Sequence, residues 1–268
     1  MNFQPVVPFT GYPGWTFLQR TQDAQQAAFT EATPVKRATA YFKENIADAR
    51  TAADLVEDRQ LLSVALGAYG LDDDIENKFF IQKILEDGTI EDDALANRLS
   101  DSRYAEFSRA FGFGDLPIAK TGISSFADRI IQRFEDKQFA RAVGNENNDL
   151  RLALNVDEGL TETIEANTTQ AGQWFSVMGN PPLRSVFQTA LGLPNSIGSV
   201  NVDQQRDIFQ TAARSALGTD KLSDIAAPEQ QEKLIRLFLV RSEAAAFAAS
   251  SSGSTALTLL QSSRFAFN

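Results

Sequence analysis

Residues 61–71 read Leu61-Leu62-Ser63-Val64-Ala65-Leu66-Gly67-Ala68-Tyr69-Gly70-Leu71, and residues 183–193 read Leu183-Arg184-Ser185-Val186-Phe187-Gln188-Thr189-Ala190-Leu191-Gly192-Leu193. Six of the eleven positions are identical between the two runs, which lie 122 residues apart. Each run ends with a bulky residue, a glycine and an apolar residue, and so does the shorter copy Ala110-Phe111-Gly112-Phe113. This order is typical of a helix that ends in a Schellman cap, in which the glycine takes a positive φ and the next apolar side chain folds back on the last turn. Two explanations stay open for the repeat: duplication of a helical unit, and convergence on a common cap.

Helix starts recur along the chain, whereas strand signals are nearly missing. Capping residues or an early proline open helices at Thr33-Pro34, at residues 51–54, at residues 125–128 and at Ala227-Pro228. Apolar residues follow two of these starts at helical spacing, namely Phe126, Ile130 and Phe134, and later Leu234, Ile235, Leu237, Phe238 and Leu239. No convincing run of alternating β-branched and aromatic residues occurs. The sequence therefore predicts an all-α protein, a multi-helix bundle-like array built from a duplicated helical unit.

The repeat and the local composition divide the chain into four segments. Residues 1–32 form an N-terminal extension and a first helix, residues 33–115 and 116–240 are two helical halves, and residues 241–268 are an Ala/Ser-rich linker with an apolar tail. The joint between the halves is short, so we expect them to pack together. Disordered tails normally avoid apolar residues, so the tail is expected to dock, either in the protein's own groove or on another chain.

Composition excludes several classes of function. The 268 residues include 25 Lys and Arg and 35 Asp and Glu, a net charge of −10. This balance argues against nucleic-acid binding, which needs a basic face. The chain has no Cys and no His, which excludes Ser-His-Asp and Cys-His catalysis, disulfides, and any plausible zinc or haem site. We expect no cofactor.

No targeting signal is apparent. The N-terminus lacks the charged and apolar regions of a secretory signal peptide, and no stretch approaches the ~18–20 uncharged apolar residues needed to span a bilayer. We expect a soluble protein without membrane insertion, which is cytoplasmic or exported without a cleaved signal peptide.

Two acidic runs, residues 72–76 and 91–93, invite a metal-binding interpretation. Neither has the alternating oxygen ligands and central glycine of a calcium loop, and both lie where helices begin, where carboxylates favour the positive end of the helix dipole. Residues 112–115 contain half of a dinucleotide-binding fingerprint but follow a helix rather than a strand. A carboxylate-based enzyme or metal-binding protein remains the alternative, with no pair of carboxylates singled out.

Several stretches together resemble a known family. They are residues 41–46, 53–71, 96–104, 151–155 and 187–194. Their order resembles the alphaproteobacterial family catalogued as domain of unknown function twelve-seventeen, over roughly residues 15–240. The runs at residues 14–21 and 256–262 resemble the form found in the Rhodobacter group. The resemblance implies an all-helical protein whose genes often lie among flagellar genes, with no assigned activity and no catalytic residues.

The resemblance and the apolar ends lead to one functional hypothesis. We expect a non-enzymatic helical protein associated with the flagellum, an assembly factor or accessory component that acts through protein–protein contacts. It lacks the terminal motif of rod and hook subunits, so we do not expect it to be one. A flagellar or other protein is the expected partner, and a homo-oligomer is a further option. The candidate partner-binding residues are Trp15, Phe17, Leu18, Leu259, Leu260, Phe265 and Phe267.

Overall fold

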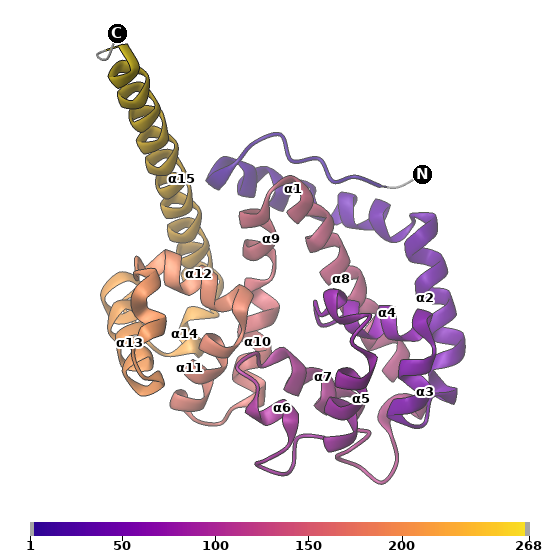
Figure 1. Ribbon diagram of the computed structural model, residues 1–268. Helices are drawn as coiled ribbons and strands as arrows, with labels where there is room; N and C mark the ends of the chain where they lie inside the picture. The colour runs from indigo at the N-terminus through magenta and orange to yellow at the C-terminus, as the bar shows by residue number, and fades with distance from the viewer. Residues whose placement is uncertain (1–2, 266–268) are drawn as a thin grey trace.

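The computed structural model describes the backbone of residues 3–265 and the side chains of residues 3–249. Within this part of the chain the structure has fifteen α-helices, four short 3-10 helices and no strand (Figure 1). The all-α prediction is confirmed. The 3-10 helices are η1 (Ile46–Asp48), η2 (Asp72–Asp74), η3 (Lys120–Gly122) and η4 (Asn195–Ser199).

The predicted glycine caps form as the sequence indicates. Gly70 and Gly192 have φ angles of 63° and 69°. In both caps the leucine after the glycine donates its N–H to a carbonyl five residues earlier, at 3.0 Å for Leu71 and 2.9 Å for Leu193, which is the Schellman bond. Gly112 has a φ of 72° and makes the single bond of the simpler left-handed cap. These caps are common to many helices, so duplication of a helical unit stays a prediction.

The predicted helix starts differ in how they are capped. Thr51 and Asp54 form a capping box, in which the Asp54 N–H donates to Thr51 Oγ1 at 3.1 Å and the Thr51 N–H donates to Asp54 Oδ2 at 2.9 Å. Helices also begin at Phe126 and Pro228, as predicted. Thr33 is the first helical residue rather than the cap, because Ala32 occupies the N-cap position and makes no side-chain bond.

Buried side chains form two hydrophobic clusters, which we call the N-terminal core and the C-terminal core. The N-terminal core spans residues 42–134 and includes Phe42, Leu55, Leu62, Phe107 and Phe126. Short helices surround it because the aromatic and branched residues recur at helical spacing on one face of each. These helices are α2 (Thr33–Asn45), α3 (Ala52–Glu57), α4 (Arg59–Gly67), α5 (Lys78–Asp87), α6 (Leu95–Arg98) and α7 (Arg103–Phe111).

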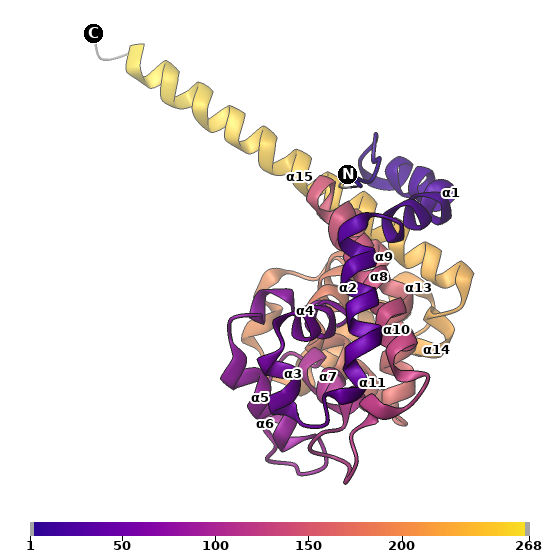
Figure 2. The ribbon, with the colours of Figure 1, turned by 90° about the vertical axis from the view of Figure 1, so that its right-hand side faces the viewer.

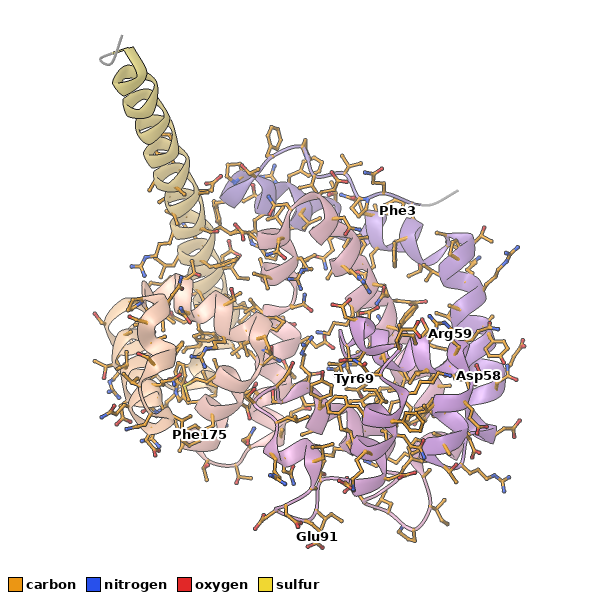
Figure 3. The ribbon with its side chains drawn as sticks, viewed as in Figure 1. Phe3, Asp58, Arg59, Tyr69, Glu91 and Phe175 are labelled. Carbon is orange, nitrogen blue, oxygen red and sulfur yellow. The ribbon has the colours of Figure 1, made fainter. Side chains whose placement is uncertain are left out.

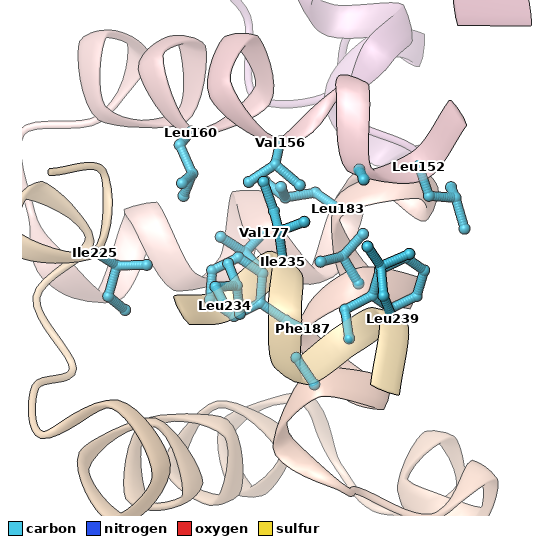
Figure 4. Packing of buried hydrophobic residues seen from close by; sticks show 14 of the residues in the cluster. Leu152, Val156, Leu160, Val177, Leu183, Phe187, Ile225, Leu234, Ile235 and Leu239 are labelled. Atoms are coloured by element: carbon cyan, nitrogen blue, oxygen red, sulfur yellow. The ribbon is translucent and has the colours of Figure 1, made fainter. Parts of the chain in front are cut away.

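The C-terminal core contains residues from both ends of the chain, from Trp15 to Leu239. Figure 4 labels its members between Leu152 and Leu239. Trp174 lies in it, fully buried, with its indole N–H donating to the Asp220 carbonyl at 2.9 Å and its ring edge-on to Phe187. Its helices are α1 (Gly11–Thr30), α9 (Asn148–Leu154), α10 (Val156–Ala166), α11 (Gln170–Gly179), α12 (Pro181–Leu191), α13 (Val202–Leu217), α14 (Leu222–Ile225) and the first turns of α15 (Pro228–Phe265).

Helix α8 (Phe126–Glu146) is shared by the two cores. Phe126, Ile130 and Phe134 belong to the N-terminal core, whereas Phe139 and Val143 belong to the C-terminal core. The boundary between the two cores therefore lies within one helix, and it does not coincide with the predicted boundary between residues 115 and 116. The segment 1–32, expected as an extension, contributes α1 to the C-terminal core.

The end of the chain differs from the expected Ala/Ser-rich linker. Among the α15 side chains that the structure describes, which end at residue 249, Leu239 is the last buried one, and Val240 is 51% exposed. Beyond that point α15 continues as one helix to Phe265 and leaves the body of the protein in both views (Figures 1 and 2). Alanine is the best helix former, serine is acceptable, and the lone Gly253 costs only about 1 kcal/mol, so this composition suits a helix as well as a linker. In residues 3–265, no helix has the length and apolarity needed to cross a bilayer.

Candidate functional site

The candidate partner-binding residues near the N-terminus lie largely inside the protein. Trp15 and Leu18 are buried in the C-terminal core, and the Trp15 indole N–H donates to a carboxylate oxygen of Glu232 at 3.1 Å. Phe17 is half-buried and lies edge-on to the ring of Phe9, 6.3 Å between centroids. Trp15 and Leu18 therefore hold α1 against α15 and present little surface to a second protein.

The other candidates lie at the C-terminal end. Leu259, Leu260 and Phe265 belong to the distal part of α15, whose side chains are outside the described residues. Phe267 lies outside the described residues altogether. The structure therefore places the backbone of three of these residues on a helix that projects from the body (Figure 1).

A charged cleft of about 480 Å³ lies where the N-terminal core meets the C-terminal core. Its walls come from the end of α4, from η2 and from α7, α8, α9, α10 and α12. Tyr69, labelled in Figure 3, lies at its base and is almost fully buried. We call the charged residues Glu106, Arg133, Lys137, Glu158 and Glu162 the cleft cluster.

Arg133 is the centre of the cleft cluster. Its side chain is only 18% exposed, forms an ion pair with Glu162, and lies 3.5 Å from Glu158. Its Nε donates to the Ala68 carbonyl at 2.6 Å, and its guanidinium carbon lies 4.0 Å from the centroid of the Tyr69 ring, a cation–π contact. Arg133 thus joins α8 to α10 and to the end of α4.

Burial shifts the ionisation of the groups around Arg133. Lys137 donates to Glu158 at 2.5 Å and to Asn155 Oδ1 at 2.8 Å, and burial lowers its pKa. Burial raises the pKa of Glu106, whose nearest cation is Arg133 at 3.8 Å and whose Oε2 has no hydrogen-bond partner. Burial also raises the pKa of Tyr69. Perturbed groups in a cleft are typical of functional sites, although structural ion-pair networks produce them as well.

A second cleft, of about 650 Å³, borders the same cluster. It is lined by Trp15, Gln26, Asp136 and Gln231, and it shares Arg133, Asn155 and Glu162 with the charged cleft. Within the cleft cluster, Glu106 and Lys137 line the charged cleft, Glu158 lines the second cleft, and Arg133 and Glu162 line both.

The predicted acidic runs have local roles. Asp72 forms an ion pair with Arg141 at 2.6 Å, Asp74 accepts the Tyr104 hydroxyl at 2.7 Å, and Glu76 pairs with Arg59 at 2.5 Å. Residues 91–93 lie in the turn before α6. Among the described residues, no group of three or more acidic side chains is arranged to hold a metal ion.

Sequence reasoning missed the cleft cluster although its spacing gave a signal. Arg133, Lys137 and Arg141 recur at four-residue intervals on α8, and Glu158 and Glu162 do so on α10. Residues four apart share one face of a helix, so the sequence contains a basic stripe on α8 and an acidic stripe on α10. Their opposite charges could have suggested that the two stripes face each other.

Comparison with known proteins identifies a relative of known structure but no activity. Residues 68–230 match the model of a family described as "Protein of unknown function (DUF1217)". The fold is similar to the crystal structure of a structural-genomics target protein from Agrobacterium tumefaciens, with a TM-score of 0.70 and 25% sequence identity over 90% of this chain and 98% of that chain. No curated protein matches the sequence.

Proposed function

The chain belongs to the DUF1217 family, and from this membership and the course of α15 we propose that it is a non-enzymatic accessory or assembly protein of the bacterial flagellum. It acts through protein–protein contacts, and the distal part of α15 is the surface that its partner covers.

The observation that carries the proposal is the projecting helix. Residues 244–263 contain no Asp, Glu, Lys or Arg, in a protein with 22% charged residues. Most helical stability in proteins comes from packing of one face against other elements rather than from intrinsic helix propensity. A partner surface that packs on this uncharged helix would supply the missing stabilisation, as in helix-in-groove recognition.

The flagellar part of the proposal is supported by the family resemblance, since genes of this family often lie among flagellar genes. The resemblance of residues 14–21 and 256–262 to the Rhodobacter-group form supports an origin in those bacteria. The protein acts in the cytoplasm or leaves the cell through the flagellar export apparatus without a cleaved signal peptide.

A truncation tests the role of α15. Removal of residues 254–268 should abolish co-sedimentation with purified flagellar basal bodies and leave the melting midpoint nearly unchanged, because the last described buried residue of α15 is Leu239 and the helix beyond it leaves the body of the protein (Figures 1 and 2). The matched control is L234A, which removes a fully buried side chain and should lower the midpoint while preserving binding below it. A large fall in the midpoint of the truncated protein would show that the tail packs on its own body. Unchanged co-sedimentation would also contradict the proposal.

Cell fractionation tests the flagellar assignment. The protein should be quantified in cytoplasm, purified flagella and culture supernatant of wild-type cells and of cells without the flagellar export ATPase. Export only when the ATPase is present would identify an export substrate, and retention with co-purifying flagellar proteins would identify a chaperone or regulator. Retention without any flagellar protein would refute the flagellar assignment.

The second candidate is a carboxylate-based enzyme or metal-binding protein. The observation that favours it is that three carboxylates, Glu106, Glu158 and Glu162, lie within ion-pair distance of Arg133 beside the two clefts. Binding to the folded state raises the melting midpoint, so a shift with millimolar Ca²⁺, Mg²⁺ or Mn²⁺ would favour this candidate. Light scattering would show in the same preparation whether the chain forms a homo-oligomer.

A further inference from the structure

Arg151 occupies an unusual position at the charged cleft. It belongs to α9, is partly buried, and lines the cleft. Its Nε and Nη2 donate to the neutral side-chain oxygen of Asn148 at 3.0 and 2.7 Å. Within the described part of the chain no carboxylate lies in ion-pair distance of it, and its Nη1 has no hydrogen-bond partner. Removing a guanidinium from water without a counter-charge is costly, so this arrangement calls for an explanation.

The neighbouring cations increase this cost. Arg103 and Arg141 line the same cleft. Each has its own acid: Arg103 pairs with Asp101 at 2.7 Å, and Arg141 pairs with Asp72 at 2.6 Å. Burial lowers the pKa of Arg151, and the positive charges of Arg103 and Arg141 lower it further. Within the described part of the chain, Arg103 and Arg141 thus have carboxylate partners and Arg151 has none. The same cleft is also lined by the carboxylates of Asp73, Glu106 and Glu162.

Glycine at position 144 makes room for Arg151 beside α8. A Cβ at Gly144 would come within 2.5 Å of Arg151 Cδ. The Arg151 side chain could therefore not lie this close to α8 if residue 144 carried a side chain.

A second donor lies in the same cleft. Asn180 caps α12 by accepting the Leu183 N–H on its Oδ1 at 3.1 Å, which fixes the amide orientation and leaves its Nδ2 as a donor. Asn180 is 8% exposed and lines the cleft, and no acceptor in the described chain receives a bond from this Nδ2. The positive end of the α12 dipole adds to the attraction for an anion.

We propose that the charged cleft is a binding site for a small organic carboxylate, with the guanidinium of Arg151 as its counter-charge and the amide of Asn180 as its second donor. A planar carboxylate matches the fork of a guanidinium. The cleft volume of about 480 Å³ suits a small molecule. This site is independent of the partner surface proposed on α15.

Ligand-dependent melting of the full-length protein tests the site. Acetate, succinate and inorganic phosphate should each be added at millimolar concentration against sodium chloride of matched ionic strength. We expect a carboxylate to raise the midpoint of the wild-type protein and of R20Q, which removes an exposed arginine on α1. In R151Q the affinity should fall about tenfold or more, and in R151K it should fall by an intermediate factor because the charge remains while the fork is lost.

The variants also separate binding from a structural role. Removal of a cation without a carboxylate partner should leave the ligand-free midpoint of R151Q unchanged or higher. A lower midpoint with an unchanged ligand shift would assign Arg151 a purely structural role and overturn the proposal. If no carboxylate shifted the melting midpoint, the proposal would be overturned as well. An equal midpoint shift with phosphate in the wild type and in R151Q would also overturn it, because it would show general stabilisation by salt.

Discussion

Replacement of Arg133 by methionine (R133M) should lower the free energy of unfolding by about 4 kcal/mol at neutral pH, since loss of one partner of a buried ion pair typically costs about 3–5 kcal/mol. Methionine fills much of the volume of the arginine stem but leaves Glu162 and Glu158 without their shared cation. The Ala68 carbonyl also loses its donor at 2.6 Å, a cost of about 1 kcal/mol that water in the cleft partly offsets. For a protein of this size, the sum corresponds to a fall of about 10 °C in the melting midpoint.

The pH dependence of this loss has a definite sign. In the folded protein, burial raises the pKa of Glu106 above its value in the unfolded chain. The contribution of Glu106 to the free energy of unfolding is therefore fully present below the unfolded pKa and is lost as the pH rises through the folded pKa. Without Arg133 that pKa rises further. The gap between R133M and the wild type should therefore be widest at about pH 7 and should narrow as the pH falls towards the ordinary glutamate pKa of 4.5.

Urea denaturation followed by circular dichroism over this pH range measures the effect. R20M, on an exposed position of α1, is the matched control and should stay within about 0.5 kcal/mol of the wild type. The double variant R133M/E162Q should recover part of the loss because it removes one unpaired charge. A loss below about 1 kcal/mol at neutral pH, or an equal loss at all pH values, would refute the reasoning.

Two further substitutions test the fold. G192A should lower the free energy of unfolding by about 1–2 kcal/mol, because Gly192 has a φ of 69° and a Cβ there would come within 2.9 Å of Arg241 Nη1. The control is G198A, where a Cβ meets no atom within 4 Å. In the same urea titration G198A should be nearly neutral. W174F should cost about 1 kcal/mol, since it removes the indole N–H bond of 2.9 Å to the Asp220 carbonyl, which then accepts only from Gln170 Nε2 at 3.2 Å. Calorimetry that detects no change in the unfolding midpoint would contradict the inferred role of the indole bond.

Local features could be predicted from the sequence because their determinants are local. The glycine caps at Gly70 and Gly192 and the capping box at Thr51 depend on residues within one turn, and the structure has them as expected. The same holds for the buried stripe of Phe126, Ile130 and Phe134 on α8. Helical periodicity was therefore sufficient for the fold class.

The cleft and the end of the chain could not be predicted in the same way. Arg133 meets Glu106, Glu162 and Tyr69 only after four separate helices pack, and no local pattern states which stripes face each other. At residues 244–254 composition alone was ambiguous, because Ala and Ser are frequent both in linkers and in helices.

The contact between α1 and α15 has a consequence for how the protein is made. Trp15 donates to Glu232, 217 positions later, so α1 leaves the ribosome long before the helix against which it packs. At about 5–20 residues per second, α1 waits roughly 10–40 s for α15, with the Trp15 side chain without this partner. The N-terminal core, whose residues end at Phe134, can assemble during that time. Chains that are still being synthesised should therefore depend more on chaperones that bind α1 than refolding full-length chains do. A chain truncated before residue 228 should have a folded N-terminal core and an exposed, aggregation-prone α1.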